Sequence, residues 1–322
     1  MATFYNVNIK EIKQETANAV SVVFSIPENI ITEFSFTAGQ YITIEKEING
    51  EAVRRAYSIC STPKSGEIRV AIKAVENGVF STYATTDLKV GDEVKISTPE
   101  GRFLLNPEAK KNYIAFAAGS GITPILSMVK SVLEHEPTST FTLIYGNKSV
   151  EDTIFYNELL ALNSKYEHFN LEFVCSRERQ ENALFGRIDT AFTNFFIKNK
   201  YKNISFNAAF LCGPEEMITT VSETLQNAGF TKNNIHFELF TASENEEATS
   251  AIKDGTTEIT VLLDDEETTF TMQQTDDILA ASLRNDLDAP YSCQGGVCSS
   301  CLAKVTEGKA VMVKNSILTD DE

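Results

Sequence analysis

Three cysteines lie close together in the segment YSCQGGVCSSC, which begins at residue 291. They are Cys293, Cys298 and Cys301, out of six cysteines in the chain. Structural zinc sites favour two Cys-x2-Cys pairs or mixed Cys and His ligands, and neither a second pair nor a histidine occurs near this segment. The spacing Cys-x4-Cys-x2-Cys is instead used by the thiolate ligands of 2Fe–2S clusters. Small residues between the ligands let backbone N–H groups approach the cluster sulfurs, so the segment predicts an iron–sulfur cluster.

This cysteine segment, together with DILAASLRND before it, resembles the plant-type ferredoxins. In that family a fourth cysteine follows well downstream, whereas 21 residues follow Cys301 here and none of them is cysteine. The other cysteines, Cys60, Cys175 and Cys212, lie in different predicted domains and are poor substitutes. We therefore expect an incomplete cluster with substoichiometric iron, which a longer chain with a further cysteine would restore.

A cluster handles one electron at a time, so another group must supply single electrons. The segment RRAYSICS resembles the R-x-Y-S motif of the ferredoxin–NADP reductase superfamily, at Arg55, Tyr57 and Ser58. The resemblance implies that Arg55 pairs with the pyrophosphate of FAD. It also implies that Tyr57 stacks on the isoalloxazine ring and that Ser58 hydrogen-bonds its N5 edge. An ordinary edge strand could carry the same four residues.

A second flavin segment of the same superfamily, G-x-x-S, is matched by ENGVFSTYA at Gly78 and Ser81. The resemblance implies that Gly78 permits close backbone approach and that the N–H groups opening the next short helix hold the phosphates. The strand AIK precedes this segment as it does in the family. The expected flavin-contacting residues of this region are Ile72, Lys73, Gly78, Val79, Phe80 and Ser81.

The segment AAGSGITPILSM follows a predicted strand and opens a predicted helix. It resembles the superfamily's nucleotide turn, with Gly119, Gly121, Thr123 and Pro124, and its place at the first strand–helix junction predicts a pyrophosphate site.

Two later segments resemble the parts of the superfamily that meet the nicotinamide and the flavin. FLCGPEEM carries Cys212, Gly213 and Pro214, and HFELF carries Glu238 and Phe240. The resemblance implies that the cysteine faces both rings and that the last segment closes over the flavin, although a cysteine can also be a small buried apolar residue. The expected catalytic residues are Ser58, Thr123 and Cys212.

The choice of nucleotide depends on CSRERQENALFGRID. Ser176 and Arg177 follow the third strand of the predicted nucleotide sheet, and Arg187 adds a second cation. A basic group at this place favours a ribose 2′-phosphate, whereas an acidic residue would favour NAD. Glu178 is adjacent, but the balance predicts NADPH.

The elements that must position these residues predict a multidomain chain. Residues 1–106 contain short strands separated by turns, which predicts an antiparallel β-barrel as the flavin domain. Residues 107–240 alternate strands and helices, which predicts an α/β doubly wound parallel sheet as the NADPH domain. The polar, acidic residues 241–256 predict a linker. Residues 257–322 contain a hairpin, a helix and the cysteine segment, and resemble an α+β ferredoxin-like β-grasp domain that is apparently truncated.

Composition limits the partners. The chain has 322 residues, 42% of them hydrophobic, and a formal net charge of -17, which argues against nucleic-acid binding. The sequence contains no apolar run long enough to predict a membrane span. It shows neither an export signal nor a disulfide framework, so a cytoplasmic location is expected. Residues 241–322 hold 17 acidic and 5 basic residues, which fits either general solubility or a docking surface for a basic partner.

The resemblance covers nearly the whole chain, in the order flavin domain, NADPH domain, ferredoxin domain. This order is similar to that of the reductase component of phenylacetyl-CoA epoxidase and related oxygenases. It implies an NADPH-dependent flavoprotein that takes a hydride onto FAD and supplies single electrons through a 2Fe–2S centre to an oxygenase. The alternative is a two-domain flavin diaphorase whose C-terminal segment is a metal-free docking module.

Overall fold

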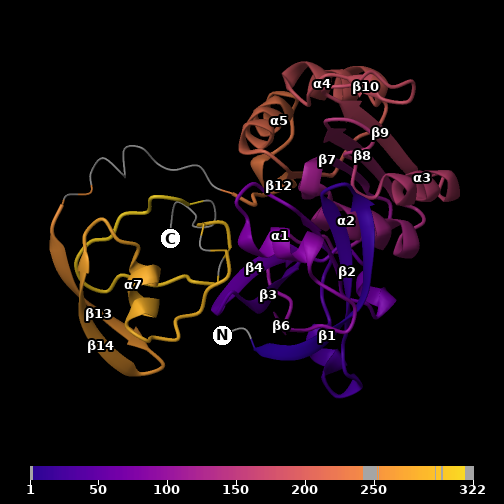
Figure 1. Ribbon diagram of the computed structural model, residues 1–322. Coiled ribbons are helices and arrows are strands. Elements are labelled where there is room, and N and C mark those ends of the chain that lie inside the picture. The colour runs from indigo at the N-terminus through magenta and orange to yellow at the C-terminus, as the bar shows by residue number, and fades with distance from the viewer. Residues whose placement is uncertain (1–2, 242–251, 253, 294, 299, 316–322) are drawn as a thin grey trace. The chain divides into compact units, whose positions relative to one another are not determined.

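The computed structural model describes residues 3–241, 252, 254–293, 295–298 and 300–315. The chain divides into two compact units, one of residues 3–240 and one of residues 1–2 and 241–322 (Figure 1). In the described residues the first unit contains two six-stranded sheets, and the second contains a two-stranded sheet. No helix in this described part of the chain is both long enough and apolar enough to cross a membrane.

The first sheet is antiparallel and curls into a barrel, as the sequence predicts (Figure 1). Its strands are β1 (Phe4–Thr16), β2 (Ala19–Ser25), β3 (Tyr41–Ile48), β4 (Glu51–Ser58), β5 (Arg69–Lys73) and β6 (Glu93–Ser97). Helix α1 (Val79–Thr86) follows β5, and the short 3-10 turns are η1 (Glu28–Phe34) and η2 (Pro63–Ser65). The strand order is β4-β3-β6-β1-β2-β5, and a bridge between Ile59 and Val70 joins the two edges.

Strand β1 is the element of the barrel that the apolar pattern does not reveal. Val7 and Ile9 are buried two residues apart, but the register shifts between Ile9 and Glu11. A bulge of this kind inserts an extra residue and breaks the period of two on which strand prediction depends.

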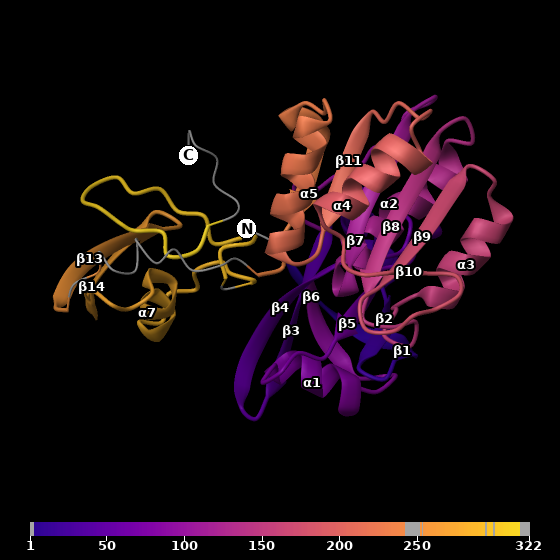
Figure 2. The same ribbon diagram turned by 90° about the horizontal axis from the view of Figure 1, so that it is seen from above.

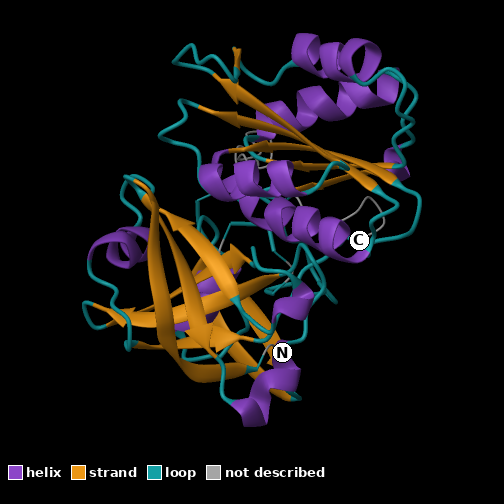
Figure 3. Cartoon of the chain, turned by 90° about the vertical axis from the view of Figure 1, so that its right-hand side faces the viewer, coloured by secondary structure: helices purple, strands orange, loops and turns teal. Residues whose placement is uncertain are grey.

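The second sheet is parallel, as predicted for the nucleotide domain. Its strands are β7 (Asn112–Ala118), β8 (Thr140–Asn147), β9 (Phe169–Cys175), β10 (Leu184–Phe185), β11 (Ala208–Cys212) and β12 (Ile235–Glu238). The helices are α2 (Ile122–His135), α3 (Tyr156–Lys165), α4 (Thr190–Asn194) and α5 (Glu215–Asn227), with 3-10 turns η3 (Gly119–Gly121) and η5 (Lys232–Asn234) and the π-helical η4 (Phe195–Lys200). Helices cover both faces of the sheet (Figure 3), and the strand order β10-β9-β8-β7-β11-β12 reverses direction at β7. Ligands of such sheets bind at the carboxyl ends of the strands near this reversal.

Two helices of this domain differ from the sequence pattern. The pattern predicts a helix from residue 152, but α3 begins only at Tyr156, because Phe155 has the left-handed φ of 63°. The pattern also predicts one helix over residues 187–199. In the structure Asp189 caps α4 by accepting a hydrogen bond from Phe192 N, and the chain then continues as the π-helical η4.

The barrel and the parallel sheet share one hydrophobic core. Ala38, Cys60 and Phe103 from the barrel side belong to the same buried cluster as the inward face of α2. The Phe103 ring packs edge-on against Phe210 of β11, with 5.9 Å between the centroids. Ser127 of α2 donates a hydrogen bond of 2.6 Å to the carbonyl oxygen of Ser61. The two domains of residues 3–240 therefore form one packed body.

The second unit contains strands β13 (Thr256–Leu263) and β14 (Glu266–Gln273) and helix α7 (Ile278–Arg284) (Figure 2). Asp264 and Asp265 both have positive φ, as a two-residue hairpin turn requires. Asp277 caps α7 by accepting a hydrogen bond from Ala280 N. The predicted linker lies for the most part outside the described residues.

A substitution of Phe103 should show that the two domains are stabilised by their shared core. Phe103→Ala removes a buried ring, so the free energy of unfolding should fall by about 3–5 kcal/mol. The neighbouring Leu104 is 37% exposed, so Leu104→Ala serves as the control and should have a much smaller effect. Urea unfolding of both variants is the measurement, and equal losses would contradict the shared core.

Candidate functional site

The predicted flavin residues Arg55, Tyr57 and Ser58 lie at the end of strand β4. The Tyr57 ring lies 5.7 Å from the Phe80 ring of α1, and burial raises the pKa of Tyr57 above its usual value. Arg55 donates a hydrogen bond of 2.7 Å to the carbonyl oxygen of Arg54. The structure thus brings the two predicted flavin segments, around Ser58 and around Gly78, into contact through their aromatic rings.

The turn before α1 requires glycine at position 78. A Cβ atom at Gly78 would lie 2.3 Å from the Ser81 hydroxyl oxygen and 2.6 Å from a Val75 methyl group. Ser81 accepts a hydrogen bond of 3.2 Å from Val75 N, which fixes the turn. Ile72 is buried in β5 and Lys73 ends that strand. Since the helix starts at Val79, its first N–H groups are free of intrahelical partners and can receive a phosphate.

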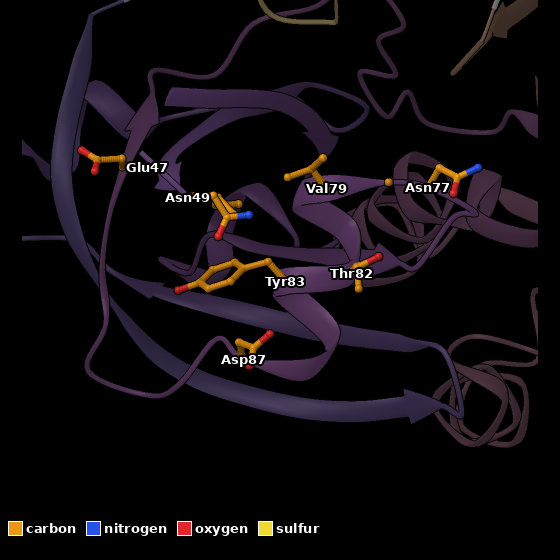
Figure 4. Close-up of a pocket in the computed structure, with 9 residues that line it drawn as sticks. Glu47, Asn49, Asn77, Val79, Thr82, Tyr83 and Asp87 are labelled. Atoms are coloured by element: carbon orange, nitrogen blue, oxygen red, sulfur yellow. The ribbon is translucent and has the colours of Figure 1, made fainter. Parts of the chain in front are cut away.

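An open pocket of about 740 Å³ adjoins this turn (Figure 4). It is lined by Glu47, Ile48, Asn49, Asn77, Gly78, Val79, Thr82, Tyr83 and Asp87. The side chains come from the β3–β4 hairpin and from α1 and the residues flanking it (Figure 4). Apart from Gly78 and Val79, these residues lie outside the motifs that the sequence reveals, because the hairpin and the helix are about thirty residues apart and carry no shared motif.

The predicted nucleotide turn packs directly against the predicted Cys-Gly-Pro turn. A Cβ atom at Gly121 would lie 2.1 Å from the Cys212 carbonyl oxygen, so only glycine fits there.

The hydrogen bonds within each turn fix its shape. Gly119 has a φ of 56°, and its carbonyl oxygen accepts a hydrogen bond of 2.9 Å from the Tyr145 hydroxyl. Thr123 donates a hydrogen bond of 3.1 Å to Ser120 O, and Pro124 lies in the first turn of α2. Gly213 leaves room for Ala118, where a Cβ would lie 3.0 Å from the alanine side chain. Pro214 precedes α5.

Ser58, Glu238 and Cys212 meet where the barrel touches the parallel sheet. Ser58 donates a hydrogen bond of 3.1 Å to a Glu238 carboxyl oxygen, although the two residues are 180 positions apart. Cys212 and Glu238 are direct partners in the pairing of β11 with β12. Burial raises the pKa of the Glu238 carboxyl to about 8. The hydrogen bond from Ser58 lowers this pKa but does not offset the effect of burial. Burial and the Glu238 charge raise the pKa of the Cys212 thiol well above its usual value. Phe240, two residues beyond β12, is 40% exposed.

The residues predicted to choose the nucleotide lie at the carboxyl ends of neighbouring strands. Ser176 and Arg177 directly follow β9, and their N–H groups donate to the carbonyl oxygens of Asn147 and Lys148 at the end of β8. Gly186, before Arg187, donates to the Cys175 carbonyl oxygen across the β9–β10 pair. The structure therefore gathers these three residues at one end of the sheet, where Lys148 follows the neighbouring strand β8.

The cysteine loop of the second unit surrounds its sulfur atoms with donors. Gly295 N donates to Cys293 Sγ at 3.3 Å, and Cys298 Sγ lies 3.7 Å from the Ser300 hydroxyl. The Cys293 thiol donates to Cys298, which lowers the pKa of Cys298 and raises that of Cys293. Burial and the Cys298 charge raise the pKa of Cys301. A buried thiolate with N–H and O–H donors around it fits a cluster ligand.

The described residues show no set of three His, Cys, Asp or Glu side chains placed to hold a single metal ion. A 2Fe–2S cluster is a larger group whose four ligands are shared between two irons. Cys60, Cys175 and Cys212 are buried within the unit of residues 3–240.

Three family matches divide the chain at the same places as these features. Residues 6–104 match the oxidoreductase FAD-binding domain, residues 116–223 the oxidoreductase NAD-binding domain, and residues 261–322 the 2Fe-2S iron-sulfur cluster binding domain. The chain is therefore a flavin- and nicotinamide-dependent oxidoreductase that carries a 2Fe–2S domain. The last match favours a cluster domain over the metal-free docking module.

Similar proteins place the chain more closely. It is 35% identical to one of the subunits of 1,2-phenylacetyl-CoA epoxidase from Escherichia coli, over 100% of the chain and 92% of that protein. It is 28% identical to the ferredoxin reductase component of 3-ketosteroid-9-alpha-monooxygenase from Rhodococcus rhodochrous, over 98% of the chain and 89% of that protein. Among solved structures, phthalate dioxygenase reductase matches with a TM-score of 0.67 and 25% identity, over 99% of the chain and 91% of that structure. The chain belongs to the ferredoxin–NADP reductase superfamily, within the three-domain reductase components of oxygenases that end in a ferredoxin domain.

The raised pKa of Glu238 makes the stability of the cofactor-free chain depend on pH. An unfolded glutamate ionises near pH 4.5, whereas the folded residue ionises near pH 8. As the pH rises the unfolded state loses this proton first, so the free energy of unfolding should fall between these two values, by about 5 kcal/mol at most. Glu238→Gln should remove this decline.

Urea unfolding across this pH range measures the effect. Glu216→Gln, which changes an exposed carboxyl on α5, is the control and should keep the wild-type profile. Parallel profiles for wild type and Glu238→Gln would show that Glu238 is not the group responsible.

Proposed function

We propose that the chain is an NADPH-dependent reductase that takes a hydride onto FAD and delivers single electrons through its 2Fe–2S domain to a separate oxygenase. The observation that carries this proposal is the meeting of Ser58, Cys212 and Glu238 at the boundary of the two nucleotide-binding domains. Each comes from a different predicted motif, and together they are the place where a flavin and a nicotinamide would face each other. FAD, when bound, accepts two electrons with the hydride and can release them one at a time.

The residues of the chain would bind and orient the two cofactors. We assign Arg55 to the FAD pyrophosphate, Tyr57 to the face of the isoalloxazine ring and Ser58 to its N5 edge. The remaining assigned flavin contacts are Ile72, Lys73, Gly78, Val79, Phe80, Ser81 and Phe240, and the open pocket beside Gly78 would receive the adenosine end. The assigned nucleotide contacts are Gly119, Gly121, Thr123, Pro124, Ser176, Arg177, Arg187, Cys212, Gly213 and Pro214. The assigned cluster ligands are Cys293, Cys298 and Cys301.

Glu238 would hold a proton beside the flavin edge. Its pKa of about 8 keeps the carboxyl largely protonated at neutral pH, and its oxygen lies 3.1 Å from the Ser58 hydroxyl. A neutral carboxyl that accepts the Ser58 hydrogen bond avoids placing a negative charge next to a site that gains electrons.

We further propose that the acceptor is an oxygenase of the phenylacetyl-CoA epoxidase kind. The support is the 35% identity to a component of that enzyme along the whole chain. The six free cysteines favour a reducing compartment such as the cytoplasm as its location.

Nucleotide choice is tested at Arg177. Arg177→Ala should weaken NADPH binding by about 1.5–3 kcal/mol, because a charge-assisted contact to the 2′-phosphate is lost, and should leave NADH unchanged. Arg179→Ala removes the same charge from the same loop, but the Arg179 guanidinium lies 4.6 Å from the centre of the Phe185 ring, so this control should keep the preference for NADPH. KM for flavin reduction by each nucleotide is the measurement. An equal loss for NADPH and NADH would remove Arg177 from the 2′-phosphate site.

The route of the electrons is tested at Cys298. Cys298→Ser should lower the cluster absorbance and the bound iron below those of the unaltered chain, because a thiolate ligand is lost. Reduction of a small artificial acceptor by NADPH should continue at the wild-type rate, since it depends on residues of the other unit. NADPH-dependent turnover of phenylacetyl-CoA with the oxygenase component of the epoxidase should stop. Undiminished turnover by this variant would show that electrons bypass the cysteine loop.

A further inference from the structure

Arg69 belongs to barrel strand β5, and its side chain also contacts residues of the nucleotide domain. One guanidinium nitrogen donates to a Glu158 carboxyl oxygen of α3 at 3.1 Å, and the guanidinium carbon lies 4.9 Å from the centre of the Phe155 ring. The other nitrogen donates to Glu15 of β1 at 2.8 Å. Lys130 of α2 forms an ion pair with the second oxygen of Glu158. Arg69 therefore joins elements of both domains in one charged cluster.

The members of this cluster are largely shielded from water. The exposed fractions of the side chains are 14% for Arg69, 4% for Glu15, 22% for Glu158 and 13% for Lys130. Burial alone would raise the pKa of Glu158, but the charges of Lys130 and Arg69 hold it below its usual value. A buried ion cluster adds little stability compared with apolar packing, because desolvation of the charges is costly. The ion cluster instead fixes how the elements that carry these side chains are oriented, since each charged group has one favourable position.

The Arg69 backbone is also tied to the strand that carries the flavin residues. Cys60 N donates to the Arg69 carbonyl oxygen at 2.8 Å, and Arg69 N donates to the Ser61 hydroxyl at 3.2 Å. Ser58 lies just before this pair of contacts. On the other side, Ser61 O receives the hydrogen bond from Ser127 of α2, the helix that begins directly after Gly121. Two connections thus run from the segment after the flavin strand to helix α2. One passes through Ser61 and Ser127, and the other passes through Arg69, Glu158 and Lys130.

Phe155 is held in an unusual backbone conformation at this contact. It is only 1% exposed and has a φ of 63°, a left-handed conformation that a residue with a large side chain rarely adopts. Such strain persists where the surroundings determine the geometry, and it is concentrated at functional positions. The left-handed conformation places the Phe155 ring against the Arg69 guanidinium, and helix α3 begins only at Tyr156.

We propose that Arg69 is a positioning residue for hydride transfer, which fixes the nucleotide domain against the barrel so that the nicotinamide meets the flavin edge at Ser58. This inference rests on the proposed function. Hydride transfer needs reacting atoms in contact, and a displacement of about 1 Å can lower a rate by about 100-fold. The cluster around Arg69 contains Glu158, Lys130 and Phe155 from the nucleotide domain and Glu15 from the barrel.

The test compares Arg69→Met and Arg69→Lys in the full chain loaded with FAD. Rapid-mixing measurements give the limiting rate of flavin reduction and the apparent Kd for NADPH separately. We expect Arg69→Met to lower the limiting rate about tenfold or more while Kd changes less than about twofold, and Arg69→Lys to recover part of the rate. Lys95→Met, which removes a cation from the Glu45 ion pair of the barrel, is the control and should leave both values unchanged.

A second measurement does not depend on activity. Hydrogen exchange of the backbone amides should accelerate in residues 59–61 and at the start of α3 in Arg69→Met, and should stay unchanged in α5. Glu158→Gln keeps the side-chain size and weakens the same contacts, so it replaces Arg69→Met if that variant does not fold.

The outcomes separate the two proposals. If the unaltered chain does not reduce its flavin with NADPH, the proposed function is wrong. If the unaltered chain does so and a folded Arg69→Met, or Glu158→Gln in its place, keeps the wild-type limiting rate, the inference about Arg69 is wrong. A loss of rate that is accompanied by an equal loss of FAD or of NADPH affinity would show a general structural role and would also overturn it.

Discussion

The burial of helix α2 between the parallel sheet and the barrel is the constraint on which the candidate site depends. Eleven of its fourteen residues are buried, so the helix is covered on all sides and cannot shift toward solvent. Its first residue follows Gly121, which packs against the Cys212 backbone without room for a Cβ atom. The position of this one helix therefore sets the distance between the nucleotide turn and the flavin strand, and the shared core with Phe103 and Cys60 maintains it.

The same packing determines the electrostatics of the site. Where the barrel and the sheet meet, water is excluded, and charged forms become costly unless a partner is present. Within the described part of the chain Glu238 accepts a hydrogen bond from the Ser58 hydroxyl and has no cation as a partner, and burial raises the pKa of its carboxyl. Arg69 has two carboxylates as partners and stays charged, so it can act as a fixed connection between domains. One interface thus contains both a group that titrates and a group that does not, and the difference lies in their partners.

The three folds could be predicted from the sequence, and so could the segments that meet in the candidate site, because periodicity and motif spacing are local properties. The parallel sheet follows from alternating apolar segments, and the turns at Gly78, Gly121 and Gly213 follow from glycines that backbone contacts require. The sequence does not predict contacts that depend on the meeting of distant segments. Ser58 and Glu238 are 180 positions apart, and Arg69 and Glu158 are 89 apart. It also misses β1, whose bulge breaks the apolar period, and the left-handed Phe155, whose conformation is imposed by its neighbours rather than by its own preference.

A bound cluster would add a further source of stability to the ferredoxin unit. One apolar cluster of its described residues consists of Phe270, Met272, Ala281 and Leu287, with three partly buried residues from the hairpin packed against it. A metal centre adds a constraint to such packing. The cysteine loop has the chemistry to provide one, since it places a thiolate of lowered pKa among N–H and O–H donors. In residues 3–240, packing holds the cofactor site in place, whereas in the ferredoxin unit the bound cluster would itself hold the loop together.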